Sequence, residues 1–320
     1  MTRVLITGGN GFIGSHLAER LEESGDSVRL FDLGFGTNVE GLSCQKVRGD
    51  VRDYLSVKNA VEGMDAVFHL AAVSRVAWGQ EDPHTCWHTN VAGTMNVLEA
   101  CARSDSRPAL FYASSREIYG EPETLPVNES AAANPISVYG VTKLSAERAC
   151  RSYSRAGGHP ESIDQVVFRF SNVYGSERDL PERVIPTFLG KALRGEDITL
   201  FGGDQTLDFT FIDDTVRGIL LAYEAALDHH PEVIGEAFHF VTGRGVSVSE
   251  LARMIVKLTD SSSRIRRGSS NGFEVRRFVG DPSKARRMLG FQSQVRLEEG
   301  LKVLRDRKLK ATVDLNPVAA

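Results

Sequence analysis

Two side chains in one short segment have the types and spacing needed to move a proton. Tyr139 and Lys143 lie four residues apart, which places both on the same face of a helix. A free tyrosine has a pKa of about 10, too high for a base at neutral pH. A neighbouring ammonium favours the phenolate, so we expect a lowered pKa for Tyr139, which could then deprotonate a hydroxyl group. The same spacing also occurs on ordinary surface helices.

A glycine-rich segment near the N-terminus has the spacing of a dinucleotide-binding turn. Gly8, Gly11 and Gly14 lie between a predicted strand and a predicted helix. Gly8 permits a tight turn, Gly11 lets a pyrophosphate approach the backbone, and Gly14 lets the helix and strand pack closely. The start of the helix, with Phe12 and Ile13, offers free N–H groups to the phosphates. A glycine-rich turn that binds nothing is the alternative.

Acidic residues at two later strand ends indicate which dinucleotide would bind. Asp32 ends the second predicted strand, where a carboxylate accepts the ribose hydroxyls of NAD and repels a 2′-phosphate. We therefore expect NAD rather than NADP, with its nicotinamide ring near Tyr139. Asp50 and Val51 follow the third strand and could hold the adenine edge, or Asp50 could simply cap a helix.

These side chains would be positioned by alternating strands and helices. The first half of the chain predicts strands at Val4–Thr7, Ser27–Asp32, Cys44–Arg48, Ala66–Ala71, Ala109–Ser114 and Gln165–Phe170. It predicts helices at Gly14–Ser24, Tyr54–Glu62, Asn90–Arg103 and Tyr139–Ala156. Apolar strands alternating with helices predict an α/β fold with a doubly wound, parallel Rossmann sheet.

The second half of the chain is broken into shorter pieces by prolines and glycines. Helical patterns recur at Arg183–Arg194, Asp213–Ala226, Val248–Thr259 and Pro282–Leu289. We expect residues 1–172 to form the dinucleotide-binding domain and 173–310 a smaller, interleaved C-terminal α/β substrate lobe. This lobe would pack over the carboxyl ends of the first lobe's strands, where such sheets bind ligands. Residues 311–320 read as a loose tail.

Composition narrows the class of protein. Net charge is −4, from 38 basic and 42 acidic residues, which argues against a nucleic-acid binder. The four cysteines lie far apart without metal-binding spacing, so we expect reduced thiols, no metal site and a cytoplasmic location. No apolar run is long enough for a signal peptide or a membrane span, so no membrane partner is expected.

Several further motifs, together with the glycine segment and the Tyr139–Lys143 pair, resemble those of one enzyme family. They are His69-Leu70-Ala71-Ala72, Asn90-Val91-Ala92-Gly93-Thr94, Ser114-Ser115-Arg116-Glu117-Ile118-Tyr119-Gly120, Arg169-Phe170-Ser171-Asn172-Val173-Tyr174-Gly175 and Asp281-Pro282-Ser283-Lys284-Ala285. The chain resembles the NAD-dependent epimerase/dehydratase family of extended short-chain dehydrogenases from residue 2 to about residue 300. The resemblance implies a nucleotide-diphosphate-sugar substrate, a UDP-sugar in the first place, and transient oxidation at C4 by bound NAD.

The resemblance also implies roles for individual residues. Ser115 matches the family residue that hydrogen-bonds the C4 hydroxyl beside Tyr139, and Asn172 matches one that contacts the substrate diphosphate. Leu70, Ala71 and Ala72 would line the NAD cleft. Residues 90–103 and 139–156 resemble the helices of the family's dimer interface, which implies a homodimer.

The residues after Ser115 bear on the reaction. In the family's 4,6-dehydratases this strand end carries an acid and then a glutamate base, and here the two positions hold Arg116 and Glu117. Glu117 could remove the C5 proton of a 4-keto sugar so that the C6 hydroxyl leaves as water. A guanidinium is a poor proton donor, so Arg116 cannot act as that acid. The Ser-Arg-Glu segment is similar to that of UDP-N-acetylglucosamine 5,6-dehydratases of antibiotic biosynthesis, which return hydride to C4. A strand-end carboxylate paired with a cation is the other interpretation of Glu117.

A second departure concerns the substrate diphosphate. Relatives carry an arginine where this chain has Leu207, and Arg276 or Arg277 could supply the missing charge, although both also fit a solvated basic face. Leu200 and Phe201 could sandwich the uracil or belong to the core. Ser74 and Arg116 complete the predicted substrate-binding set.

Four hypotheses remain open at this point. The first is a sugar-nucleotide dehydratase, and the second is a UDP-sugar 4-epimerase that uses Ser115, Tyr139 and Lys143 alone. A third is a short-chain reductase acting outside sugar chemistry, against which Asp32 and Asn172 speak. The fourth is an NAD sensor, which would not need an activated phenol.

Overall fold

The core of the molecule is a seven-stranded parallel sheet, in a computed structural model that describes residues 1–154, 161–228, 230, 232–268 and 275–315. The strands run in the order β10-β6-β5-β4-β1-β2-β3, and every neighbouring pair is parallel. Their bounds are β1 Arg3–Thr7, β2 Ser27–Asp32, β3 Gln45–Arg48, β4 Ala66–His69, β5 Ala109–Ser115, β6 Gln165–Phe170 and β10 Ala237–Phe238. The chain reverses direction across the sheet at β1, so the doubly wound α/β fold is confirmed.

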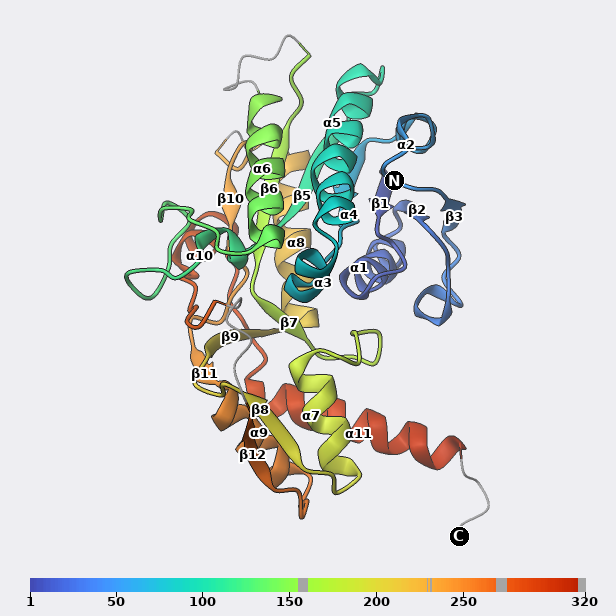
Figure 1. Cartoon of the computed structure of the whole chain (residues 1–320). Coiled ribbons are helices and arrows are strands. Elements are labelled where there is room, and N and C mark those ends of the chain that lie inside the picture. Colours follow the sequence, from blue (N-terminus) through green and yellow to red (C-terminus); the bar gives the residue numbers. More distant parts are fainter. Residues whose placement is uncertain (155–160, 229, 231, 269–274, 316–320) are drawn as a thin grey trace.

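Helices cover both faces of this sheet, and alternate strand residues feed two separate cores. Val4 and Ile6 of β1 pack with α1 (Phe12–Glu23) and α8 (Ile212–Leu227). Leu5, between them, packs with α2 (Tyr54–Val61), α5 (Gly93–Arg103) and α6 (Val138–Ser152) on the opposite face. Figure 1 shows α5 and α6 side by side in front of the strands, with α8 behind them. Burial on both faces explains why these strands are continuous apolar runs.

The second half of the chain forms two small sheets beyond the carboxyl ends of the large one (Figure 1). One orders β11 (Gly245–Ser247), β9 (Thr206–Phe211) and β7 (Asn172–Tyr174), and the other pairs β12 (Ile265–Gly268) with β8 (Ile198–Phe201). The accompanying helices are α7 (Val184–Leu193), α9 (Val248–Leu258), α10 (Ser283–Leu289) and α11 (Leu297–Leu315). Because β10 pairs with β6, the second half of the chain also contributes a strand to the large sheet.

The predicted strands and helices agree with the structure within a few residues, whereas the six strands that follow β6 and the helix α11 were not predicted. Two short helices, α3 (Val76–Glu81) and α4 (Pro83–Trp87), occupy a stretch for which no element was predicted. The predicted helix 139–156 ends at Ser152, and residues 155–160 lie outside the described part. The expected tail is wrong at its start, because α11 continues to Leu315; residues 316–320 are not described.

Cys44, Cys86, Cys101 and Cys150 are all free thiols, and three of them are buried. In the described part of the chain, no helix combines the length and apolar character needed to cross a membrane.

Candidate active site

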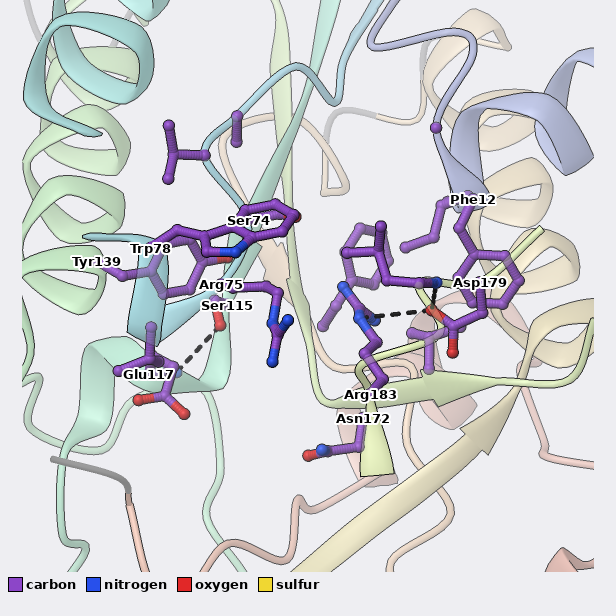
Figure 2. A pocket seen from close by; sticks show the side chains of 18 of the residues that line it. Phe12, Ser74, Arg75, Trp78, Ser115, Glu117, Tyr139, Asn172, Asp179 and Arg183 are labelled. Carbon is purple, nitrogen blue, oxygen red and sulfur yellow. Dashed lines mark hydrogen bonds and ion pairs between the residues drawn. The ribbon is translucent and has the colours of Figure 1, made fainter. Parts of the chain in front are cut away.

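A cleft of about 1560 Å³ runs along the carboxyl ends of the large sheet's strands. One wall comes from residues just after β1, β2, β4 and β5, and the other from β7, β8, β9 and the segment before α7. Figure 2 shows Tyr139, Ser115 and Glu117 on one side, Phe12 on the other, and Asn172 reaching in from β7. This is the expected position for a ligand between the sheet and the second half of the chain.

The glycine segment lies at one end of this cleft and is closely packed. Gly8 has a φ of +72°, and a Cβ there would come within 2.7 Å of the backbone nitrogen of Ala71. A Cβ on Gly14 would collide with the Gly8 carbonyl oxygen, so α1 can approach the turn only with glycine at this position. Gly11 precedes α1 and has no side chain between the backbone and the cleft. The tight turn at Gly8 and the close packing at Gly14 are as expected from the sequence.

The other residues predicted to hold the cofactor also line this end of the cleft. They are Phe12, Ile13, Asp32, Asp50, Val51, Leu70, Ala71 and Ala72. The Asp32 carboxylate accepts hydrogen bonds from the backbone N–H groups of Asn10 (2.9 Å) and Leu33 (2.8 Å), which fix its orientation. Burial raises the pKa of Asp32, and these hydrogen bonds oppose the shift.

Asp50 differs from Asp32 in how its carboxylate is used. Its side chain forms an ion pair with Arg52 at 2.6 Å, and the hydrogen bond from this guanidinium is the main reason that its pKa is lowered. The helix cap considered for Asp50 is instead formed by Asp53, which accepts a hydrogen bond from the backbone N–H of Leu55. Asp50 therefore faces the cleft with its charge already balanced.

Tyr139 is positioned by the start of α6 and by a close approach at Gly140. Ser137 caps the helix by accepting a hydrogen bond from the Gly140 N–H at 3.1 Å. A Cβ on Gly140 would lie 2.6 Å from the Glu117 carbonyl oxygen, so glycine lets α6 pack directly on the turn after β5. This contact sets Tyr139 beside Ser115 and Glu117 at the end of the strand (Figure 2).

The electrostatics of the Tyr139–Lys143 pair differ from the expectation. Burial raises the pKa of Tyr139 to about 12, and the charge of Glu117 adds to this, while Ser115 and Arg183 lower it. Lys143 is itself buried, which lowers its pKa to about 8, and its Nζ donates a hydrogen bond to the Ala113 carbonyl at 2.8 Å. The expectation of a lowered pKa for Tyr139 is wrong for the protein alone, because desolvation outweighs the groups that lower this pKa, and Nζ of Lys143 lies 5.9 Å from the ring centroid.

Ser115, Arg116 and Glu117 form the turn at the end of β5. The Ser115 hydroxyl accepts a hydrogen bond from the Glu117 N–H at 3.2 Å and caps the short helix η3 (Arg116–Tyr119). The Glu117 and Arg116 side chains form an ion pair at 3.0 Å, and only 6% and 11% of them is exposed. Arg116 also donates a hydrogen bond from Nε to the Asn172 side-chain oxygen at 3.0 Å. All four residues line the cleft.

The remaining predicted substrate residues divide into two groups. Ser74, Phe201 and Arg276 line the cleft. Leu200 does not, because its side chain points into the core and is 2% exposed, so the predicted sandwich is wrong for this residue. Arg277 is also absent from the cleft wall, since neighbouring residues of an extended segment point to opposite sides.

Several charged and aromatic residues of the cleft were not predicted. Arg183 precedes α7 and forms an ion pair with Asp179 at 3.4 Å. The Asp179 side chain is 2% exposed, and burial raises its pKa to about 6. Arg75 lies over the ring of Trp78 and pairs with Glu182, joining the two walls of the cleft. The pattern of the sequence shows no signal for these residues, because each reaches the cleft through a loop or a short helix.

The groups that line the cleft are suited to binding a dinucleotide. The cleft combines backbone that approaches without side chains at Gly8 and Gly11, a fixed carboxylate at Asp32, and a buried Tyr–Lys pair at the opposite end. For the described residues, no group of three or more His, Cys, Asp or Glu side chains is arranged to hold a metal ion.

Comparisons with known proteins agree with this geometry. Residues 4–235 match the model of the NAD dependent epimerase/dehydratase family. The chain is 33% identical over 320 residues to UDP-N-acetyl-alpha-D-glucosaminuronate decarboxylase of Bacillus cytotoxicus, covering 94% of this chain and 95% of that protein.

Solved structures give the same result. UDP-glucose 4-epimerase of Thermotoga maritima, solved with UDP-glucose, aligns with a TM-score of 0.89 at 30% identity over 97% of this chain and 99% of that one. The dTDP-glucose 4,6-dehydratase DesIV of Streptomyces venezuelae, solved with NAD bound, aligns with a TM-score of 0.87 at 28% identity over 98% of each chain. The cofactor is NAD, and the chain belongs to the NAD-dependent epimerase/dehydratase family of sugar-nucleotide enzymes.

Proposed function

We propose that this enzyme is a UDP-sugar dehydratase that acts on UDP-N-acetylglucosamine, as do the 5,6-dehydratases of tunicamycin biosynthesis. The observation that carries the proposal is the position of Glu117. Its buried carboxylate lies in the cleft wall beside Ser115, and its charge raises the pKa of Tyr139, so the two groups share one site. A carboxylate there is suited to removing a proton next to the carbon that Tyr139 acts on.

In the proposed reaction, NAD supplies reversible hydride acceptance at C4 of the sugar. Tyr139 takes the proton of the C4 hydroxyl, and Ser115 orients that hydroxyl. The resulting ketone acidifies C5–H, and Glu117 removes this proton. The C6–O bond breaks, and the departing hydroxyl takes a proton from Glu117, so that one water leaves. Reduction at C4, with the proton that Tyr139 took returned to the C4 oxygen, would give a 5,6-ene sugar. Reduction at C6, with a proton from solvent added at C5 and the Tyr139 proton released to solvent, would give a 4-keto-6-deoxy sugar.

The substrate diphosphate needs positive partners, which we assign to Arg183 and Arg276. Leu207 is apolar and 7% exposed, whereas these two arginines line the cleft with at least part of each side chain accessible. The Asn172 side chain would complete this set. Phe201, 59% exposed at the edge of the cleft, offers a face for the uracil.

The test is mass spectrometry of UDP-N-acetylglucosamine after incubation with the purified enzyme. A product lighter by one water supports dehydration, and proton NMR then separates the two possible products. Glu117→Gln should abolish water loss, while Glu182→Gln, which alters another carboxylate of the cleft, should leave it intact. An isomer of unchanged mass, formed equally by wild type and Glu117→Gln, would overturn the role of Glu117.

A UDP-sugar 4-epimerase is the second candidate. It is favoured by the likeness to the Thermotoga maritima UDP-glucose 4-epimerase and requires only Ser115, Tyr139 and Lys143. In that case the enzyme would return hydride to the opposite face of C4, and Glu117 would serve only to neutralise Arg116.

We also propose how the chain is organised. Residues 1–172 would form the NAD-binding domain and 173–310 the substrate lobe, in a cytoplasmic homodimer. The exposed apolar side chains of Trp87, Met95 and Val141, on α4, α5 and α6, support an interface on that face. Sedimentation of the purified protein tests the dimer, and Val141→Glu should yield a monomer.

A further inference from the structure

The Arg116–Glu117 pair has a property that neither proton transfer nor phosphate binding requires. Both side chains are almost fully buried, and their closest atoms, Nη2 and Oε1, are 3.0 Å apart. A buried guanidinium and a buried carboxylate cancel each other's charge, and neither is well tolerated without the other. The cleft wall next to Ser115 is therefore close to electrically neutral at this point.

The Arg116 guanidinium has three neighbours in the structure, but one of its nitrogen atoms donates no hydrogen bond to the described residues. Besides Glu117, it donates from Nε to Asn172 of β7 at 3.0 Å and lies 5.9 Å from the centroid of the Phe278 ring. Its Nη1 is buried and has no hydrogen-bond partner among the residues that the structure describes. A buried donor without an acceptor is costly, so a small movement of the Arg116 side chain toward the cleft that let Nη1 donate to an oxygen of a bound molecule would remove this cost.

The neutrality of this pair determines whether a hydroxyl or a carboxylate at C6 of the sugar binds better beside Arg116 and Glu117. A sugar hydroxyl is uncharged, so it can lie beside Arg116 in the cleft, and accept a hydrogen bond once Nη1 moves toward it, without disturbing the neutral pair. A carboxylate at C6 would lose part of its hydration in the cleft, and a pair without net charge offers it no free cation in return, so its binding is disfavoured. The Bacillus cytotoxicus relative, a uronate decarboxylase by name, shows that the family also contains enzymes of charged sugars.

We propose that Glu117 neutralises the positive charge of Arg116. The pair thereby determines the selectivity of the enzyme for sugars with an uncharged C6 substituent over uronates. Without the Glu117 charge, Arg116 becomes a carboxylate site suited to a nucleotide-diphosphate uronate. The inference rests on the proposed function only in placing the sugar beside Ser115 and Tyr139. It concerns binding, so it holds for a dehydratase and for a 4-epimerase alike.

The experiment measures the Kd of UDP-glucose and of UDP-glucuronic acid by calorimetry on the NAD-containing enzyme. Wild type should bind the uronate about tenfold or more weakly. Glu117→Gln, which keeps the size of the side chain, should shift the ratio of the two constants toward the uronate by about tenfold or more. The control is Glu182→Gln, which removes the carboxylate from the Arg75–Glu182 pair in the same cleft and should change the ratio by less than about twofold.

The double variant Arg116→Gln/Glu117→Gln tests whether Arg116 is the group uncovered. The gain in uronate binding should disappear in it. Wild type that binds both sugars equally, or a ratio unchanged by Glu117→Gln, would overturn the proposal, and the wild-type measurement stands even where a variant fails to fold. Water loss is assayed separately, so failure of the dehydratase assignment leaves the binding ratios interpretable.

Discussion

The two ends of the cleft are built from different kinds of structure. At the dinucleotide end, strand ends and glycine backbone form the surface, and the main side chain, Asp32, is fixed by neighbouring N–H groups. The opposite end holds Ser115, Glu117 and Tyr139 and is called the sugar end after the proposed function. Here side chains from η3, α6, β7 and the segment before α7 meet, and they pair mainly with one another. A backbone-built site tolerates little change in sequence, whereas a site built from paired side chains can change its ligand when one pair changes.

The largest effect that tests this difference comes from Tyr139→Phe, at the sugar end. Loss of the phenol should lower kcat by roughly 10²- to 10⁴-fold, because proton transfer from the C4 hydroxyl is lost. The Kd for UDP-sugar should change little. Tyr112→Phe is the control, since the ring centroid of this buried tyrosine lies 5.1 Å from Nζ of Lys143 but the residue does not line the cleft. Equal losses in the two variants would contradict a catalytic role for Tyr139.

Asp179 can be tested through the pH dependence of the free energy of unfolding, because burial disfavours the charged form of its carboxyl group. Its pKa rises from 3.8 to about 6 on folding, so the folded protein binds more protons than the unfolded chain between these values. The contribution of the Asp179 carboxylate to the free energy of unfolding therefore falls as pH rises through that window, by up to about 3 kcal/mol. Asp179→Asn should gain stability relative to wild type as pH rises from about 4 to 7, measured by urea unfolding.

The control for Asp179 is Asp197→Asn. Asp197 is partly exposed, and hydrogen bonds from Arg264 and Arg266 lower its pKa, so its contribution has the opposite sign. This variant should lose stability relative to wild type as the carboxylate ionises. The same pH trend in both variants would show that the Asp179 carboxylate is not held in a desolvated state.

At the dinucleotide end, Asp32→Asn should weaken NAD binding by roughly 10- to 100-fold, since charge-assisted hydrogen bonds to the ribose are lost. It should also narrow the preference for NAD over NADP, because the charge that repels the 2′-phosphate is gone. Asp50→Asn should have a much smaller effect, as that carboxylate is already paired with Arg52. Fluorescence titration of both cofactors measures the two constants, and equal effects would contradict the assignment of Asp32.

Phe201→Ala should give the smallest effect, an increase in KM of between roughly twofold and tenfold, because one exposed ring contributes about 1 kcal/mol by stacking. The control is Ile265→Ala, an exposed apolar residue on the adjacent strand β12 that does not line the cleft. An unchanged KM in Phe201→Ala would remove this residue from the nucleotide site.

The contrast between the two ends also explains how much could be predicted from the sequence. The glycine spacing and the acid at the end of β2 are local patterns, so the residues proposed to bind the dinucleotide could be named from the sequence. The strand pattern predicted the large sheet because buried parallel strands are short apolar runs. Its edge strand β10, two residues long, gave no such signal.

The sugar end could be predicted only in part, because its residues come from distant segments. Ser115, Glu117 and Asn172 followed from motifs shared with relatives, whereas Asp179 lies in a loop without periodicity and Arg183, at the start of α7, belongs to none of these motifs. Leu200 and Phe201 are neighbours in β8, and only packing determines which of them faces the core. The pKa of Tyr139 depends on its burial, which no spacing of residues reveals.

The late position of β10 in the sequence has a consequence for synthesis of the chain. β6 pairs with β10 through residues 167–168 and 237–238, and Lys284 of α10 then donates a hydrogen bond to the Ala237 carbonyl at 2.8 Å. While the ribosome is still adding the intervening residues, the outer edge of β6 lacks this cover. Exposed strand edges are templates for aggregation, so a nascent chain or fragment that ends before β10 should associate through β6.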